Sequence, residues 1–264
     1  MGLRLVAGHL CAAVMALAMA TASSHVLAAE PLVAAAADLK FALEEVAQAF
    51  KRDTGRSVTL TFGSSGTFAT QIRNGAPFQM YLSADEDYVF KLHAERLTRD
   101  RGTPYAIGRI AIMAPPGSML AVDTELNGLA AQLKAGKIKH FAIANPAHAP
   151  YGRRAEEALK HAGLWETIRP RLVFGENVSQ AAQFAISGSA EGGIIALSLA
   201  KSPQMARMGR YAVIPADWHA PLRQRMVLLK NAGPEAHEFY RYLQQPAARE
   251  VMRRYGFELP GEAN

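Results

Sequence analysis

Alternating hydrophobic and polar positions predict the first strands of this chain. Residues 58–62 alternate large apolar side chains with threonine, as expected of a strand with one buried face. The turn at 63–66 reads Gly-Ser-Ser-Gly, and residues 67–74 then carry apolar side chains at helical spacing. This order of strand, tight turn and helix predicts one unit of an α/β sheet.

The same order of elements recurs along the chain and predicts an α/β fold with two lobes. The last strand and two helices are too few for a domain of their own, so we expect them to complete the first lobe. The lobes are then residues 29–107 plus 222–264 and residues 108–221, with crossings near 106–108 and 220–223. The expected strands are 32–37, 58–62, 78–83, 109–114, 140–144, 172–174, 193–197 and 225–229, and the main helices are 38–51, 67–74, 126–135, 153–161, 178–187, 234–243 and 246–255.

Residues 1–28 have the pattern of a cleaved secretory signal peptide. Arg4 is their only formally charged residue, an apolar core covers 10–20, and the small-residue cleavage pattern ends at Ala28. The core is about half the ~20 residues that a membrane span needs. Cys11, the single cysteine, lies inside this core, so we expect a periplasmic protein without disulfides and not a lipoprotein.

Composition sets limits on the partners. Of 264 residues, 50% are hydrophobic and 20% charged, which is ordinary for a globular protein of one large or two small domains. The net charge of +6 is spread over helices of mixed sign instead of forming a basic run. This argues against nucleic acid as a partner.

Two predicted helices begin where neighbouring parallel strands end, and this edge is where open α/β sheets bind ligands. Ser64 and Ser65 precede one helix, and Asp38 begins the other. Helix starts offer unpaired N–H groups and partial positive charge, which favour anions. Asn177 is a further candidate helix cap, for a helix that starts at Val178. Asp38 is interpretable as an N-cap, but its carboxylate would oppose a fully ionised oxyanion.

Common catalytic motifs are missing from the sequence. There is no Gly-x-Ser-x-Gly, P-loop or dinucleotide fingerprint, and the eight histidines show no zinc spacing. His148, between two prolines in the turn at 145–152, is the histidine placed to approach a ligand, whereas His140 is expected to be structural. A hydrolase using Ser64 or Ser65 would need a base supplied by the fold.

Several segments together resemble the periplasmic molybdate-binding proteins of ABC importers. The resemblance spans nearly the whole mature chain and implies a two-lobed solute-binding fold (type II), each lobe a mostly parallel sheet flanked by helices. It also implies a tetrahedral dianion held without countercharge by hydroxyls and backbone N–H groups. The segments are Ala-Ala-Ala-Asp-Leu (35–39), Phe-Gly-Ser-Ser-Gly-Thr (62–67), Gln-Ile-Arg-Asn-Gly-Ala-Pro (71–77), Leu-Ser-Ala-Asp (82–85), Asn-Pro-Ala-His-Ala-Pro-Tyr-Gly (145–152), Glu-Asn-Val (176–178) and Arg-Tyr-Gly-Phe (254–257).

The resemblance assigns ligand roles to particular residues. Ser65 matches the serine of the second helix, and Tyr151 and Val178 match the backbone donors. Two positions depart from the family: Asp38 replaces the usual first-helix serine, and Ala196 replaces a tyrosine whose hydroxyl completes many sites. The hydroxyl of Tyr151 is a candidate replacement.

We therefore predict an exported solute-binding protein, not an enzyme, that delivers an oxyanion to the membrane permease of an ABC importer. The ligand is molybdate or tungstate, with no cofactor, no free metal cation, no nucleic acid and no membrane insertion, and the protein is expected to be a monomer. One alternative is a protonated oxyanion such as hydrogen phosphate, selected by Asp38, and another is a serine-dependent hydrolase. The predicted ligand-binding residues are Asp38, Ser64, Ser65, Tyr151 and Val178.

Overall fold

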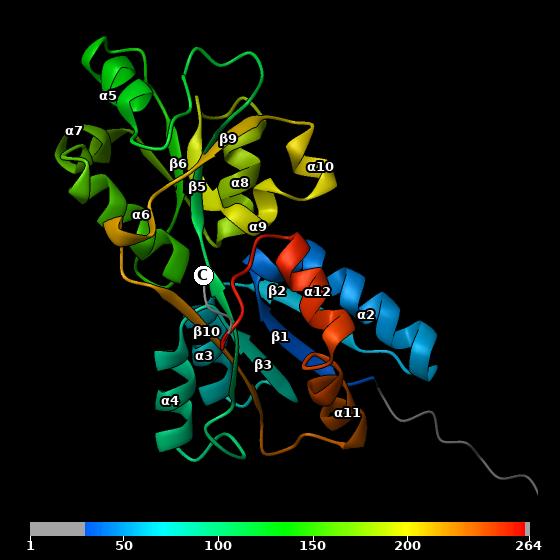
Figure 1. Ribbon diagram of the computed structural model, residues 1–264. Helices are drawn as coiled ribbons and strands as arrows, with labels where there is room; N and C mark the ends of the chain where they lie inside the picture. The colour runs from blue at the N-terminus through cyan, green and yellow to red at the C-terminus, as the bar shows by residue number, and fades with distance from the viewer. Residues whose placement is uncertain (1–29, 262–264) are drawn as a thin grey trace, which may run out of the picture.

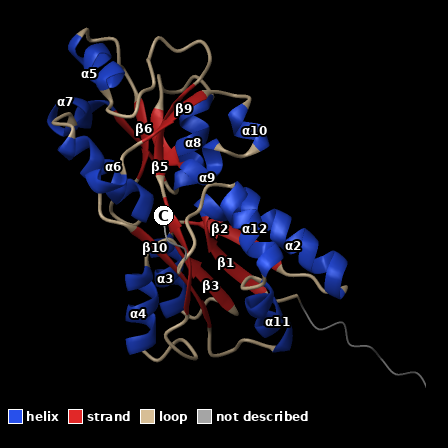
Figure 2. Cartoon of the chain, viewed as in Figure 1, coloured by secondary structure: helices blue, strands red, loops and turns tan. Residues whose placement is uncertain are grey.

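The computed structural model describes residues 30–261, so the predicted signal peptide and Cys11 lie outside the described residues. The chain forms two lobes, each built on one sheet with helices against it (Figures 1 and 2). The predicted two-lobed α/β solute-binding architecture is confirmed. Within residues 30–261, no helix is long and apolar enough to cross a membrane.

Each lobe contains a five-stranded mixed sheet. The strand orders are β2-β1-β3-β10-β4 in the first lobe and β7-β6-β8-β5-β9 in the second. The first sheet consists of β1 (Leu32–Ala36), β2 (Thr59–Gly63), β3 (Met80–Ser83), β4 (Thr103–Gly108) and β10 (Leu222–Leu228). The second consists of β5 (Ile110–Ala114), β6 (Phe141–Ala144), β7 (Leu172–Gly175), β8 (Gly193–Ala196) and β9 (Arg210–Val213).

Each sheet is mixed, with two parallel and two antiparallel pairings, but four of its five strands run in the same direction, as expected of a mostly parallel sheet. In the first sheet, β1 pairs in parallel with β2 and β3, whereas β10 runs antiparallel to β3 and β4. The second sheet repeats this pattern, with β5 antiparallel to β8 and β9. The chain crosses between lobes as extended strands, and strands that return without a crossover helix pair antiparallel.

The crossing segments lie side by side. Only Arg109 separates β4 from β5, so the chain leaves the first lobe almost without a turn. On its return, Leu222 of β10 pairs with Gly108 of β4. Strands β4 and β9 are missing from the sequence-based prediction, because β4 contains a proline and a glycine, which are uncommon in strands, and β9 is short and largely exposed.

Helices cover both faces of the first sheet, as the alternation of its side chains requires. Val33 and Ala35 face one cluster, which includes residues of α2, α11 and α12, whereas Ala34 faces a second cluster with residues of α3 and α4. The helices of this lobe are α2 (Lys40–Thr54), α3 (Ser65–Arg73), α4 (Glu86–Ala94), α11 (Pro234–Tyr242) and α12 (Pro246–Arg254), with a 3-10 turn, η1 (Ala37–Leu39), before α2.

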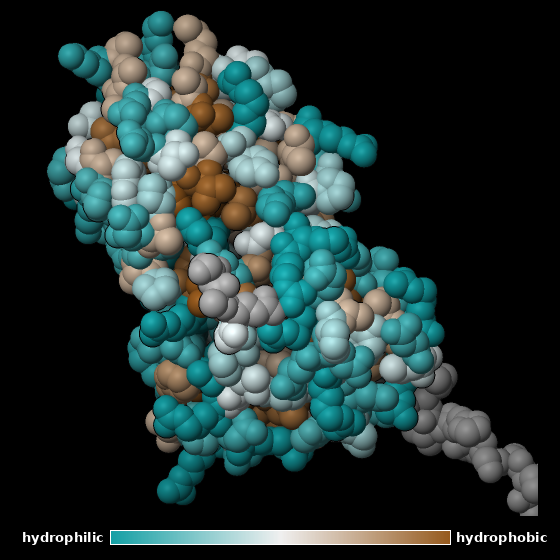
Figure 3. All heavy atoms as spheres, viewed as in Figure 1, coloured by the Kyte–Doolittle hydropathy of each residue, from teal (hydrophilic) through white to brown (hydrophobic). Residues whose placement is uncertain are grey.

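The second lobe has its own hydrophobic core, centred on β5, β6 and β8. On the face shown in Figure 3, hydrophilic residues predominate and hydrophobic ones gather in the upper lobe between α6 and α9. The helices of this lobe are α5 (Asn127–Lys134), α6 (Pro150–His161), α7 (Trp165–Ile168), α8 (Val178–Ile186), α9 (Leu197–Ala200) and α10 (Pro203–Ala206), with 3-10 turns η2 (Arg169–Arg171) and η3 (Ala216–Trp218).

The packing of α11 against α2 generates a test of the fold. Phe239 is fully buried, and its ring meets that of Phe50 edge-on, with centroids 5.1 Å apart. We expect Phe239→Ala to lower the free energy of unfolding by about 3–5 kcal/mol, because it leaves a cavity between two helices distant in sequence. Urea unfolding measures this, with Met119→Ala, at a position 70% exposed, as a control expected to change it by less than about 0.5 kcal/mol. A loss below about 1 kcal/mol would contradict the packing.

Candidate functional site

A small cavity lies between the two lobes, where several helices begin. The space open to the centre of a water-sized sphere is about 10 Å³, near the minimum for one water molecule. The lobes are therefore nearly closed on one another, and only a small ligand suits the site. The cavity is lined by Ala36, Ala37, Asp38, Gly63, Ser64, Ser65, Ala84, Ala149, Pro150, Tyr151 and Val178.

The topology explains why these residues meet. Strand β1 leads through η1 into α2 and β2 leads into α3, while β6 and β7 of the second lobe lead into α6 and α8. All four strands contribute their carboxyl ends, which is the binding edge of an open α/β sheet. The five predicted ligand residues, Asp38, Ser64, Ser65, Tyr151 and Val178, all line the cavity.

Ser64 and Ser65 have different roles at the start of α3. The Oγ of Ser64 accepts a hydrogen bond from Thr67 N at 3.2 Å, which is an N-cap, and its hydroxyl donates to Thr67 Oγ1 at 2.8 Å. Ser65 is fully buried, and its Oγ accepts from Ala84 N at 3.0 Å. No described residue receives the hydroxyl proton of Ser65, so this hydroxyl is free to donate into the cavity.

The interpretation of Asp38 as an N-cap is wrong. Asp38 lies inside η1, and neither η1 nor α2 has a side-chain cap. The chain forms a 3-10 turn before α2, and this turn directs the Asp38 carboxylate towards the second lobe. There its Oδ2 accepts hydrogen bonds from the Tyr151 hydroxyl at 2.9 Å and from Gln224 Nε2 at 2.7 Å. Its Oδ1 is buried and accepts no well-formed hydrogen bond from any described residue.

Gln224 and Tyr105 complete this cluster and are missing from the predicted site. Gln224 Nε2 also donates to the Tyr151 hydroxyl at 3.1 Å, and Gln224 Oε1 accepts from the Tyr105 hydroxyl at 2.6 Å. A signal for Gln224 exists in the sequence: it occupies an inward position between Leu222 and Met226 in an alternating strand. A buried amide at such a position requires partners.

Burial changes the proton affinity of Asp38. Asp38 as a whole is 1% exposed, and loss of solvation raises the pKa of its carboxyl group from 3.8 to about 6. The hydrogen bonds from Gln224 and Tyr151 act in the opposite direction, as do the nearby backbone N–H groups of Asp38 and Leu39. Burial also raises the pKa of Tyr151 and Tyr105 well above the usual value, and the Asp38 charge adds to this, so both phenols stay protonated.

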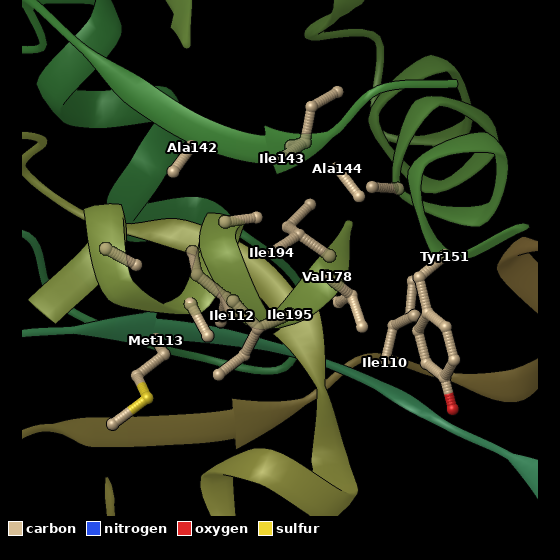
Figure 4. Packing of buried hydrophobic residues seen from close by; sticks show 14 of the residues in the cluster. Ile110, Ile112, Met113, Ala142, Ile143, Ala144, Tyr151, Val178, Ile194 and Ile195 are labelled. Atoms are coloured by element: carbon tan, nitrogen blue, oxygen red, sulfur yellow. The ribbon is translucent and has the colours of Figure 1, made fainter. Parts of the chain in front are cut away.

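Tyr151 and Val178 lie at the first turns of α6 and α8. Figure 4 shows both beside the hydrophobic core of the second lobe, with the Tyr151 hydroxyl directed away from Ile143 and Ile194. As residues at helix starts, their backbone N–H groups have no partner within the helix. Asn177 caps α8 as predicted, by accepting from Ser179 N and Gln180 N at 3.0 Å each. Ala196 is fully buried and is not among the residues that line the cavity.

Direct contacts join the lobes around the cavity. His148 accepts a hydrogen bond from Gly66 N through its carbonyl at 3.0 Å, and its Nδ1 lies 2.9 Å from Ser64 Oγ. Arg153 donates to Asp85 Oδ2 at 2.7 Å, which closes the outer side of the junction. His148 thus bonds to the first lobe beside the cavity, and it is not among the residues that line it.

The site has the chemistry of an anion site and not of a cation site. Residues 30–261 contain no group of three or more histidine, cysteine, aspartate or glutamate side chains placed to hold a metal ion. Around the cavity the available groups are one serine hydroxyl, helix-start N–H groups and the single buried carboxyl group of Asp38. Donors of this kind stabilise a small oxyanion.

Comparisons with known proteins agree with this chemistry. The family model described as bacterial extracellular solute-binding protein matches residues 31–258. The molybdate-binding protein ModA of Azotobacter vinelandii is 38% identical over 88% of this chain and 91% of its own length, and that of Rhodobacter capsulatus is 35% identical over 93% of each. The solved structure of the Azotobacter periplasmic molybdate-binding protein superposes with a TM-score of 0.79 at 30% identity, over 88% of this chain and all of that one.

The buried carboxyl group of Asp38 generates a pH prediction for the ligand-free protein. Because folding raises its pKa from 3.8 to about 6, its favourable contribution is complete below pH 3.8 and is lost as the pH rises through 6. Asp38→Asn keeps an oxygen for the Tyr151 and Gln224 donors but carries no charge. At pH 7.5 we expect this variant to be more stable than wild type by up to about 3 kcal/mol, with the difference vanishing near pH 4. Urea unfolding at both pH values measures this difference. A difference independent of pH would show that ionisation of Asp38 does not destabilise the folded protein.

Proposed function

The chain belongs to the family of bacterial extracellular solute-binding proteins, and from this premise we propose that it binds molybdate between its lobes and delivers it to the permease of an ABC importer. The observation that carries the proposal is the convergence of three helix starts and the Ser65 hydroxyl on one small cavity. The names of the relatives favour molybdate over the hydrogen phosphate alternative.

We assign ligand contacts to four residues and a supporting role to a fifth. Ser65 donates its hydroxyl proton, Tyr151 and Val178 donate backbone N–H groups, and Ser64 shapes the start of α3 as its N-cap. Asp38 faces the ligand from the start of the first helix unit. A tetrahedral oxyanion with four acceptor oxygens matches donors that come from both lobes. Ligand capture is thereby coupled to closure, since neither lobe alone supplies the full set.

One arrangement resembles the catalytic triad of a serine hydrolase: Ser64 contacts the His148 ring, and the ring in turn lies near Glu176. The geometry favours an interlobe contact instead. The hydroxyl of Ser64 donates its proton to Thr67, and its oxygen caps α3. The Glu176 side chain is 77% exposed, and its carboxylate lies 3.6 Å from Nε2 of His148. A nucleophile requires a base that accepts its proton. We therefore propose a binding protein in the periplasm, not an enzyme.

Ligand identity is testable by thermal denaturation of the chain that begins at residue 29. Molybdate at 100 times its dissociation constant should add about 2.7 kcal/mol to the free energy of unfolding, since it binds only the folded state. Tungstate should act similarly, whereas sulfate and phosphate at equal concentration should give smaller shifts. The reverse order, with phosphate the stronger stabiliser, would reject molybdate as the ligand.

Ser65→Ala tests the hydroxyl donor. We expect molybdate binding to weaken by about 1.5–3 kcal/mol, because one hydrogen bond to a charged ligand is lost. The substitution should also lower the stability of the ligand-free protein, since Ala84 N would lose its buried acceptor.

A matched control separates the two effects of that substitution. Ser83 is also fully buried and hydrogen-bonds Tyr81 and Asp85, but it does not line the cavity. Ser83→Ala should therefore lower stability while leaving the dissociation constant for molybdate, measured by calorimetric titration on folded protein, within about twofold. Equal loss of affinity in both variants would show that Ser65 acts through the fold and not on the ligand.

A further inference from the structure

The two oxygens of the Asp38 carboxyl group have opposite surroundings. Oδ2 accepts two hydrogen bonds, from Tyr151 at 2.9 Å and Gln224 at 2.7 Å. Oδ1 is equally buried yet accepts no well-formed hydrogen bond from a described residue, although Asp38 lines the cavity. A buried carboxylate oxygen without a well-formed hydrogen bond is unusual, and it points to a group supplied when the site is filled.

The donors at Oδ2 are held in one direction. The Tyr105 hydroxyl donates to Gln224 Oε1, which turns the Nε2 end of that amide towards Asp38 and Tyr151. Because Gln224 Nε2 already donates to the Tyr151 oxygen, the Tyr151 proton is directed to Asp38. Oδ2 is thus faced by two hydrogen atoms and has no place for a third. A proton on Asp38 must therefore sit on Oδ1.

No residue within 30–261 supplies a countercharge to Asp38. Of the elements packed against its turn, α8, α9 and β2 carry no titratable side chain, and Ser198 of α9 binds the Asp38 carbonyl. Lys40 of α2 is directed to Glu44 at 3.5 Å. The facing groups on β4, α6 and β10 are the neutral Tyr105, Tyr151 and Gln224. A fully ionised oxyanion beside an ionised Asp38 would meet like charge with nothing to offset it.

We propose that Asp38 binds one proton on Oδ1 when molybdate enters the cavity, so that a neutral carboxyl group donates a hydrogen bond to the anion. The inference rests on the proposed function. The proton comes from solvent, no bond to molybdenum forms, and the bound ligand stays a dianion. The Oδ1–H group stands where the related proteins are expected to present a serine hydroxyl, and it offers the same type of donor. Molybdate capture by this chain is thus coupled to proton uptake.

Calorimetric titration of the wild-type mature chain with sodium molybdate tests the coupling. Titrations in two buffers of different ionisation enthalpy give the number of protons exchanged. We expect about one proton taken up per molybdate at pH 8 and a dissociation constant that rises roughly fifty-fold from pH 6 to pH 8, given a free Asp38 pKa of about 6. Binding without proton uptake, at an affinity that is the same at both pH values, would overturn the inference while leaving the proposed function intact.

Two variants locate the proton. Asp38→Asn keeps the acceptor for Tyr151 and Gln224 and places an uncharged N–H donor where Oδ1 stands. We expect it to bind molybdate with no proton uptake and less than about threefold change in affinity between pH 6 and pH 8. Histidine side chains in general also exchange protons near neutral pH, and His148 lies beside the cavity. His148→Gln is therefore the matched control, and it should take up as many protons per molybdate as the wild-type protein.

Each result has a definite meaning. Proton uptake that persists in Asp38→Asn but vanishes in His148→Gln would overturn the assignment to Asp38. If Asp38→Asn does not fold, the wild-type proton count and the His148→Gln control decide. Absence of molybdate binding to wild type at pH 6 would reject the proposed function itself, and the inference with it.

Discussion

The junction of the two lobes depends on one buried carboxyl group. Asp38 stands at the end of β1, and its Oδ2 is held by Tyr151 from the second lobe and by Gln224 from the returning strand β10. A carboxylate removed from water is costly unless donors replace the lost hydration. The hydrogen bonds to Asp38 therefore help to fix the position of α6 relative to β1. They also stabilise the closed arrangement of the lobes around the cavity.

Close approach at two glycines makes this junction possible. A Cβ at Gly108 would lie 2.2 Å from the Tyr151 hydroxyl, and one at Gly66 would lie 2.6 Å from the carbonyl oxygen of His148. A side chain at position 66 would push against the backbone of the other lobe, whereas one at position 108 would displace the Tyr151 hydroxyl and the Gln224 amide. The absence of these two side chains therefore lets Tyr151 and His148 lie close to the first lobe.

The aspartate at position 38, where the resemblance leads us to expect serine, is understandable if it is protonated in the complex, as we propose. The first helix unit must present a donor to an anion, and a carboxyl group does so only when protonated. Burial raises its pKa to about 6, while Tyr151 and Gln224 occupy the other oxygen. The hydroxyl of Tyr151, the candidate replacement for the tyrosine expected at Ala196, donates to Asp38. The division into lobes at 29–107 plus 222–264 and 108–221 stays a prediction.

Local patterning by itself determined much of this protein. Apolar periodicity located most strands and helices, and Ser64, Ser65, Asn177 and Val178 were identifiable at helix starts because capping and turn chemistry act between near neighbours. Only the tertiary structure decided the role of Asp38. Its partners Tyr151 and Gln224 are 113 and 186 residues away, and a side chain that looks like a cap in sequence becomes a buried interlobe group when distant strands bring those partners to it. The mixed sheets have the same origin, since strand direction follows from how the chain crosses between lobes and not from the pattern within any strand.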